Sequence, residues 1–169
     1  MPNFLEPTFE ELQYHQKFLK SRKTMAFHHG TKEFPKEEWK SFYQTWVKDN
    51  ADREYKLVFC PGCQDFVGEM FLEKVSDDTL KAYFLVKYEH RNEGYGQTIL
   101  ERIVAHAKQN HYAYILIRTY ADNPGITFLT KRGFFIKETK DNISTLKLIL
   151  KDSHLDETCS TCKCDKTQH

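Results

Sequence analysis

The sequence predicts a mixed α/β fold with the element order α-α-β-β-β-α-β-α-β-β. Two segments within the first fifty residues have helical apolar spacing, and from Tyr55 onward the apolar residues follow strand patterns. A strand–helix–strand unit over residues 79–119 then predicts a right-handed crossover and one central parallel strand pair. This order excludes a helical bundle and an all-β sandwich.

Two helices are expected at the start of the chain. Thr8 and Glu11 have the spacing of a capping box, so the first helix should run from Thr8 as N-cap to about Lys20. Pro35 suits the first position of a second helix that ends near Asn50. The apolar residues of the two helices are Phe9, Leu12 and Leu19, and then Trp39, Phe42, Trp46 and Val47.

Three strands and the crossover follow. Residues 55–59, 65–73 and 79–86 read as strands, with Cys60-Pro61-Gly62-Cys63 as the turn between the first two. A polar loop with Gly94 and Gly96 opens a helix with apolar positions Ile99, Leu100, Ile103, Val104 and Ala107.

The last elements complete the sheet. Residues 114–119 form an apolar run that suits a buried parallel strand. A short helix over residues 125–132 ends at Gly133, and residues 134–139 and 143–150 form a closing hairpin. We therefore expect one domain over residues 1–151, followed by a polar, cysteine-containing mobile tail at residues 152–169.

Composition narrows the function. The chain has 169 residues, 40% of them hydrophobic, with a net charge of +1, so we expect neither a nucleic-acid nor a membrane partner. Neither a membrane-length apolar run nor a secretory signal is visible, which favours a cytoplasmic protein. Its oligomeric state, monomer or homodimer, stays open.

The glycine loop after residues 79–86 predicts an anion site. Consecutive backbone N–H groups and the positive end of the following helix point at one place, and glycine permits close approach of a phosphate. The loop has no Gly-Lys-Ser/Thr and no third glycine, so it is neither a P-loop nor a dinucleotide-binding fingerprint. On its own, Gly-x-Gly is a weak signal, and a tight strand–helix turn is the better interpretation of it.

The surrounding motifs resemble those of the GNAT acetyltransferase superfamily. Arg91-Asn92-Glu93-Gly94-Tyr95-Gly96 matches the core of motif A, Arg/Gln-x-x-Gly-x-Gly/Ala, and residues 120–126 with 131–134 look like motif B. The resemblance implies the GNAT fold, with the parallel pair splayed around acetyl-CoA. It assigns the cofactor to Leu85, Val86, Arg91, Asn92, Glu93, Gly94, Tyr95, Gly96, Gln97, Thr98, Asp122, Asn123 and Phe128, although Phe128 is an equally good core residue.

Two residues that the family uses for proton transfer are missing. The motif B tyrosine position holds Leu129, and the third-strand glutamate position corresponds to about Leu80. Candidate replacements are Glu69 as a base acting through a water, and Tyr120 as a proton donor to the thiolate. The simpler interpretations are a solvated carboxylate for Glu69 and core packing for Tyr120.

The acceptor site is expected beside these residues. His28 and His29 lie in the loop that lines the acceptor site in relatives, and one of the two is expected to be structural. Glu73 lies on the same strand face as Glu69. The acceptor implied is a primary amine of a small molecule, such as a polyamine or amino acid, or of a protein or peptide.

The five cysteines leave a further possibility. Cys60 and Cys63, with Cys159 and Cys162, form two Cys-x-x-Cys pairs that suit a Cys₄ zinc site, although about a hundred residues separate them. The alternative is a pair of exposed thiols on a turn and a loose tail. Three functions thus remain: an N-acetyltransferase using acetyl-CoA, a CoA-binding sensor or interaction domain without turnover, and a zinc-stapled binding module.

Overall fold

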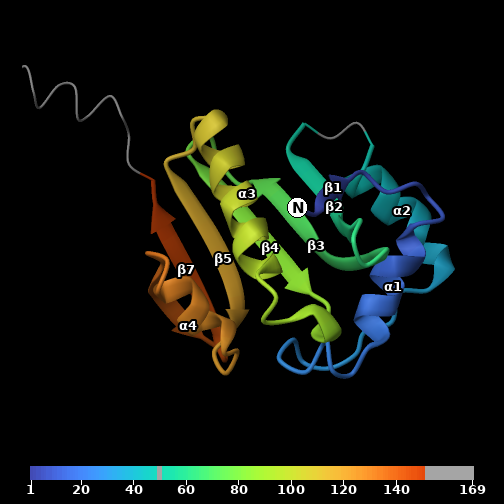
Figure 1. Cartoon of the computed structure of the whole chain (residues 1–169). Helices are drawn as coiled ribbons and strands as arrows, with labels where there is room; N and C mark the ends of the chain where they lie inside the picture. The colour runs from blue at the N-terminus through green and yellow to red at the C-terminus, as the bar shows by residue number, and fades with distance from the viewer. Residues whose placement is uncertain (49–50, 151–169) are drawn as a thin grey trace, which may run out of the picture.

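The computed structural model describes residues 1–48 and 51–150, which form one mixed sheet with helices on both faces (Figure 1). The helices are α1 (Leu12–Lys20), α2 (Lys36–Trp46), α3 (Tyr95–Gln109) and α4 (Gly125–Thr130), with a 3₁₀ turn at Tyr88–His90. The strands are β1 (Asn3–Leu5), β2 (Arg53–Cys60), β3 (Asp65–Lys74), β4 (Thr79–Val86), β5 (Tyr114–Tyr120), β6 (Phe135–Lys140) and β7 (Ile143–Ile149).

The sheet has the spatial order β1-β2-β3-β4-β5-β7-β6. All neighbouring strands are antiparallel except β4 and β5, which are parallel and are joined through α3. Figure 1 shows α3 lying across β4 on one face of the sheet. The predicted mixed α/β class and the central parallel pair are therefore confirmed.

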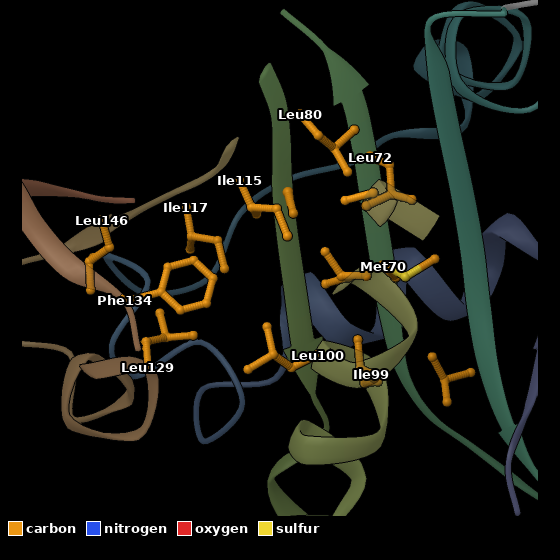
Figure 2. Packing of buried hydrophobic residues seen from close by; sticks show 14 of the residues in the cluster. Met70, Leu72, Leu80, Ile99, Leu100, Ile115, Ile117, Leu129, Phe134 and Leu146 are labelled. Atoms are coloured by element: carbon orange, nitrogen blue, oxygen red, sulfur yellow. The ribbon is translucent and has the colours of Figure 1, made fainter. Parts of the chain in front are cut away.

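Each face of the sheet has its own apolar core. The core under α3 and α4 contains Met70, Leu80, Ile99, Ile115 and Leu129, all of which are buried (Figure 2). The core under α1 and α2 is more aromatic, with Phe18, Phe34, Trp39, Tyr55 and Phe66 among its buried residues. Because side chains alternate between faces along a strand, successive residues of β3, and likewise of β4, pack into opposite cores.

Several predicted boundaries move in the structure. The capping box forms, since the Thr8 N–H donates to Glu11 Oε1 at 2.9 Å and the Glu11 N–H donates to Thr8 Oγ1 at 3.3 Å. Regular α-helix nevertheless begins only at Leu12, because the residues before it form tighter i→i+3 bonds. Pro35 is the N-cap of α2 rather than its first residue, and α2 ends at Trp46 rather than near Asn50.

The structure contains two elements that the sequence analysis did not predict, and two predicted segments extend beyond the described residues. Strand β1 pairs with residues 57–59 of β2, and the 3₁₀ turn at Tyr88–His90 follows β4. Residue 50 and the predicted tail at 152–169 lie outside the described residues. None of the helices in the described part of the chain combines the length and apolar composition that a membrane crossing requires.

Candidate active site

The parallel strands β4 and β5 separate halfway along their length. Their pairing runs from Thr79 opposite Tyr114 to Ala82 opposite Ile117. β4 then continues to Val86 and β5 to Tyr120 without pairing to each other within residues 51–150. The carboxyl end of β4 therefore presents a strand edge that is not paired with β5, as the family resemblance implied.

The glycine loop brings a helix N-terminus to this opening. Gly94 is the N-cap of the 15-residue helix α3 with a φ of 91°, and Asn92 has a φ of 63°. The first N–H groups of a helix have no intrahelical acceptor, so this end attracts anions. A Cβ on Gly96 would lie 3.7 Å from the Phe128 ring and 3.9 Å from the Phe84 ring, so a side chain there would enter the opening.

We define the first cleft as the cavity of about 380 Å³ at this opening. The predicted cofactor residues that line it are Leu85, Val86, Arg91, Asn92, Gly94, Gly96, Gln97, Asn123 and Phe128. Arg132, which the sequence analysis did not select, also lines it, and its guanidinium lies 3.6 Å from the centre of the Phe128 ring. The predicted helix over residues 125–132 placed Arg132 four residues after Phe128, which was the signal available in the sequence, although α4 ends at Thr130.

Four predicted cofactor residues lie outside the lining of the first cleft. Glu93 Oε2 is 3.1 Å from His90 Nδ1, the Thr98 hydroxyl donates to the Gly94 carbonyl at 3.2 Å, and Asp122 is exposed. Tyr95 packs edge-on against His90. Because the prediction for this loop concerned backbone N–H groups as well as side chains, these assignments stay predictions.

Arg91 and Asn123 shape the first cleft through hydrogen bonds to the backbone and to neighbouring side chains. Arg91 donates from Nη2 to the Thr24 carbonyl at 2.6 Å and from Nε to the Val86 carbonyl at 3.2 Å. Partial burial lowers the pKa of this guanidinium below its usual value, yet it stays charged. Asn123 donates to Thr119 Oγ1 at 2.8 Å.

A second cleft of about 520 Å³ lies on the α1 and α2 side of the sheet. Its floor consists of residues of β3, β4 and β5, and its walls come from α1, α2 and the loop after α1. The predicted residues Glu69, Glu73, His28 and Tyr120 line it. His29 does not, and its ring stacks on that of Tyr120 with a centroid distance of 3.5 Å.

Glu69 is fully buried in this second cleft. Its Oε2 lies 2.7 Å from His15 Nδ1 and accepts a hydrogen bond of 2.7 Å from the Tyr55 hydroxyl. Its Oε1 is buried and has no hydrogen-bond partner among the described residues. The interpretation of Glu69 as a solvated carboxylate is therefore wrong, because α1 brings His15 over the sheet and covers the carboxylate.

The charge of Glu69 affects the groups around it. Burial, together with this carboxylate, raises the pKa values of the Tyr55 and Tyr83 phenols well above their usual range. Burial, together with the cations Arg91 and Lys32, lowers the pKa of His28 from 6.5 to about 4. At neutral pH the site thus holds protonated phenols and a neutral His28 imidazole.

The two clefts meet at four residues that line both, His28, Tyr83, Arg118 and Thr119. They lie where β4 and β5 separate, with His28 contributed by the loop after α1. The sequence analysis selected only His28 among them. His15, Tyr55 and Tyr83 were missed because their helix and strand patterns are also those of core residues.

The positions of the missing family residues are apolar and buried in the structure. Leu129 lies at the edge of the first cleft with 4% of its surface exposed, and Leu80 belongs to the core beneath α3. Neither position supplies a proton-transfer group. Any such group must therefore come from elsewhere in the clefts.

Cys60 and Cys63 differ from both of their expected states. The structure joins them in a disulfide across the β2–β3 turn, which replaces the expected exposed thiols. The N–H of Cys63 also donates to Cys60 Sγ at 3.3 Å, and Cys63 Sγ lies 3.7 Å from the Tyr95 hydroxyl. Cys159 and Cys162 lie outside the described residues. Within residues 1–48 and 51–150, no three His, Cys, Asp or Glu side chains form a group that could hold a metal ion.

Comparison with known proteins gives a family and a fold. The family model described as "Acetyltransferase (GNAT) domain" matches residues 5–134. No curated protein matches the sequence. Solved structures of similar fold include three proteins that are at most 16% identical to this chain.

The GNAT domain of Streptomyces lividans PAT is 16% identical, with a TM-score of 0.71, over 88% of this chain and 90% of that chain. The PaiA N-acetyltransferase of Thermoplasma acidophilum, in complex with coenzyme A, is 14% identical with a TM-score of 0.68, over 89% and 99%. The spermidine N-acetyltransferase of Vibrio cholerae, in complex with CoA and spermine, is 14% identical with a TM-score of 0.69, over 88% and 95%.

Proposed function

Because the chain belongs to the GNAT acetyltransferase domain family, we propose that it transfers the acetyl group of acetyl-CoA to a primary amine by direct attack. The observation that carries the proposal is the meeting of two clefts at His28, Tyr83, Arg118 and Thr119. One cleft suits a phosphate-bearing donor, and the other has a buried carboxylate beside the meeting point. Holding both reactants there converts a bimolecular reaction into an effectively unimolecular one.

The residues of the first cleft suit CoA. The N–H groups at the start of α3 would bind the pyrophosphate, and the free edge of β4 would pair with the pantetheine amides. The Lys87 N–H bonds to the Val67 carbonyl on β3 at 2.8 Å. Because successive N–H groups of a strand alternate between its edges, the Val86 N–H is directed to the open edge. It is therefore suited to donate to the developing oxyanion of the thioester carbonyl, the activated group that acetyl-CoA supplies.

Proton transfer requires one acceptor and one donor. The attacking nitrogen forms a bond to the acetyl carbon, the carbon–sulfur bond breaks, and the proton lost by the nitrogen must be taken up. Glu69 is suited to accept this proton at Oε1 through a water, since Oε2 is held by His15 and Tyr55. The Vibrio cholerae neighbour, a spermidine N-acetyltransferase in complex with CoA and spermine, supports acetyl transfer to an amine in general.

The departing thiolate needs a proton donor, and Tyr83 suits this role better than Tyr120. Tyr83 lines both clefts, whereas Tyr120 lines only the second and stacks on His29. Burial raises the pKa of the Tyr83 phenol, so the phenol is protonated but a weak acid, and its position between the clefts is what favours it as the donor. Tyr120→Phe is therefore a matched control for Tyr83→Phe.

The experiment measures acetyl-CoA-dependent thiol release with a panel of primary amines for the wild type, Glu69→Gln, Tyr83→Phe and Tyr120→Phe. We expect losses of about 10²-fold or more for the first two variants and little change for the third. Binding of acetyl-CoA without thiol release for any amine would contradict the proposal and support a CoA sensor instead. Equal losses for Tyr83→Phe and Tyr120→Phe would contradict the assignment of Tyr83.

A further inference from the structure

The second cleft carries more unpaired positive than negative charge. The cations that line it are Lys32, Lys81 and Arg118, and the carboxylates are Glu69 and Glu73. Polar groups at the surface of a cavity select ligands of complementary charge. Which of these five side chains are already paired therefore determines the charge of the acceptor that the cleft favours.

One oxygen of each carboxylate has a partner, whereas Glu69 Oε1 has none among the described residues. Glu73 Oε2 lies 2.9 Å from Arg53 Nε in an ion pair, and Glu69 Oε2 is occupied by His15 and Tyr55. By contrast, the side chains of the three cations make no hydrogen bond or ion pair with the residues that the structure describes. Apart from the Glu69 carboxylate, the charged side chains of the cleft that have no ion-pair partner among the described residues are therefore positive.

The sheet and the loop after α1 bring these cations to one cavity. On β4, Lys81 pairs with Leu116 of the parallel strand β5, and Arg118 follows Leu116 by two residues on the same face. Lys32 comes from the loop after α1 that forms a wall of the cleft. The positive charges of Arg91 and Lys32 also act on His28, because after burial they are the next causes that lower its pKa.

We propose that the acceptor is a primary amine that also carries an anionic group, a carboxylate, phosphonate or phosphate, bound by Lys32, Lys81 and Arg118. This inference rests on the acetyl transfer proposed above and names its substrate class. The amine lies at the junction of the clefts beside Glu69, forms the bond to the acetyl carbon as the carbon–sulfur bond breaks, and loses one proton to Glu69. The thiolate takes one proton from Tyr83. A polyamine, with several positive charges, meets like-charge repulsion from the same three cations.

The test compares amines of similar length that differ in the charge at their far end. These are β-alanine and 2-aminoethylphosphonate as anionic amines, propylamine as a neutral-tailed amine and spermidine as a polycation. The kcat/KM of each is measured by thiol release for the wild type, Lys81→Met and Lys32→Met. Lys137→Met serves as the control, because Lys137 is exposed on the edge strand β6 and lines neither cleft.

We expect an anionic amine to have at least about a tenfold higher kcat/KM than propylamine or spermidine. Lys81→Met and Lys32→Met should each lower this value about tenfold for the anionic amine and leave that of propylamine within about twofold. Lys137→Met should change neither.

Two outcomes would overturn the inference in distinguishable ways. Efficient acetylation of spermidine, or equal losses for anionic and neutral amines in the lysine variants, would refute the anionic acceptor and leave acetyl transfer intact. Absence of thiol release with every amine, despite binding of acetyl-CoA, would refute acetyl transfer and the inference with it.

Discussion

The ionisation of His28 gives a quantitative test of the site, because this side chain lines both clefts. Its pKa is lowered from 6.5 to about 4 by burial and then by Arg91 and Lys32. Each pKa unit corresponds to about 1.4 kcal/mol, so the full difference is about 3 kcal/mol. Because the imidazole is only partly buried, solvent screening reduces the expected value to about 1–2 kcal/mol.

The sign follows from the two protonation equilibria. In the unfolded chain His28 binds a proton near pH 6.5, whereas in the folded chain it stays neutral until about pH 4. Its contribution to stability is therefore fully present above pH 6.5 and is lost as the pH falls toward 4. His28→Gln removes the titrating group and keeps a polar side chain.

The assay is urea denaturation of the wild type and His28→Gln at pH 8 and at pH 4.5, with each free energy of unfolding obtained by linear extrapolation. The difference between wild type and variant isolates His28 from the other groups that titrate in this range. We expect the wild type to lose about 1–2 kcal/mol relative to the variant on going to pH 4.5. A difference that does not change with pH would refute the reasoning, and so would one that grows in favour of the wild type.

Two further variants test the supports of the site. Gly68→Ala places a Cβ 2.3 Å from the Leu85 carbonyl oxygen, so β3 and β4 must shift. We expect the free energy of unfolding, measured by urea denaturation, to fall by about 2 kcal/mol or more. The control is Gly62→Ala, whose Cβ meets only Cys60 Sγ at 4.0 Å and which should cost less than about 0.5 kcal/mol. Equal costs for the two glycine variants would contradict the close approach. Tyr55→Phe removes the hydroxyl that donates to Glu69 and should destabilise the fold by about 1–3 kcal/mol at pH 7, and an unchanged urea midpoint would show that this hydrogen bond contributes nothing.

Much of the fold was predictable because its strands and α3 have strong, uninterrupted periods. The strand at Thr79–Val86 has the predicted bounds, and the crossover through α3 follows from its chirality and length. Strand β1 was not predicted, because three residues are too few to show a period and their pairing with β2 is a tertiary contact. The late start of α1 and the cap position of Pro35 are likewise decided by local hydrogen bonding.

The two halves of the site differ in how far the sequence predicts them. The glycine loop is contiguous, so Gly94 and Gly96 could be located from a motif. The second cleft is assembled from separate elements, and His15 reaches Glu69 across 54 residues. Nothing in the pattern around Glu69 distinguishes a buried carboxylate from an exposed one, because the burial depends on where α1 packs.

The central claim, that the first cleft binds acetyl-CoA through the N-terminus of α3, is tested most directly by calorimetric titration of the wild type, Gly94→Glu and Gly30→Glu with acetyl-CoA. Gly30 is the matched control, since both glycines have positive φ, 91° and 78°, and neither has an atom within 4 Å of an added Cβ. Backbone strain is thus similar in the two variants, and only Gly94→Glu brings a negative charge to the phosphate position. We predict binding by the wild type and by Gly30→Glu and none by Gly94→Glu; failure of the wild type to bind acetyl-CoA, or undiminished binding by Gly94→Glu, would contradict the claim.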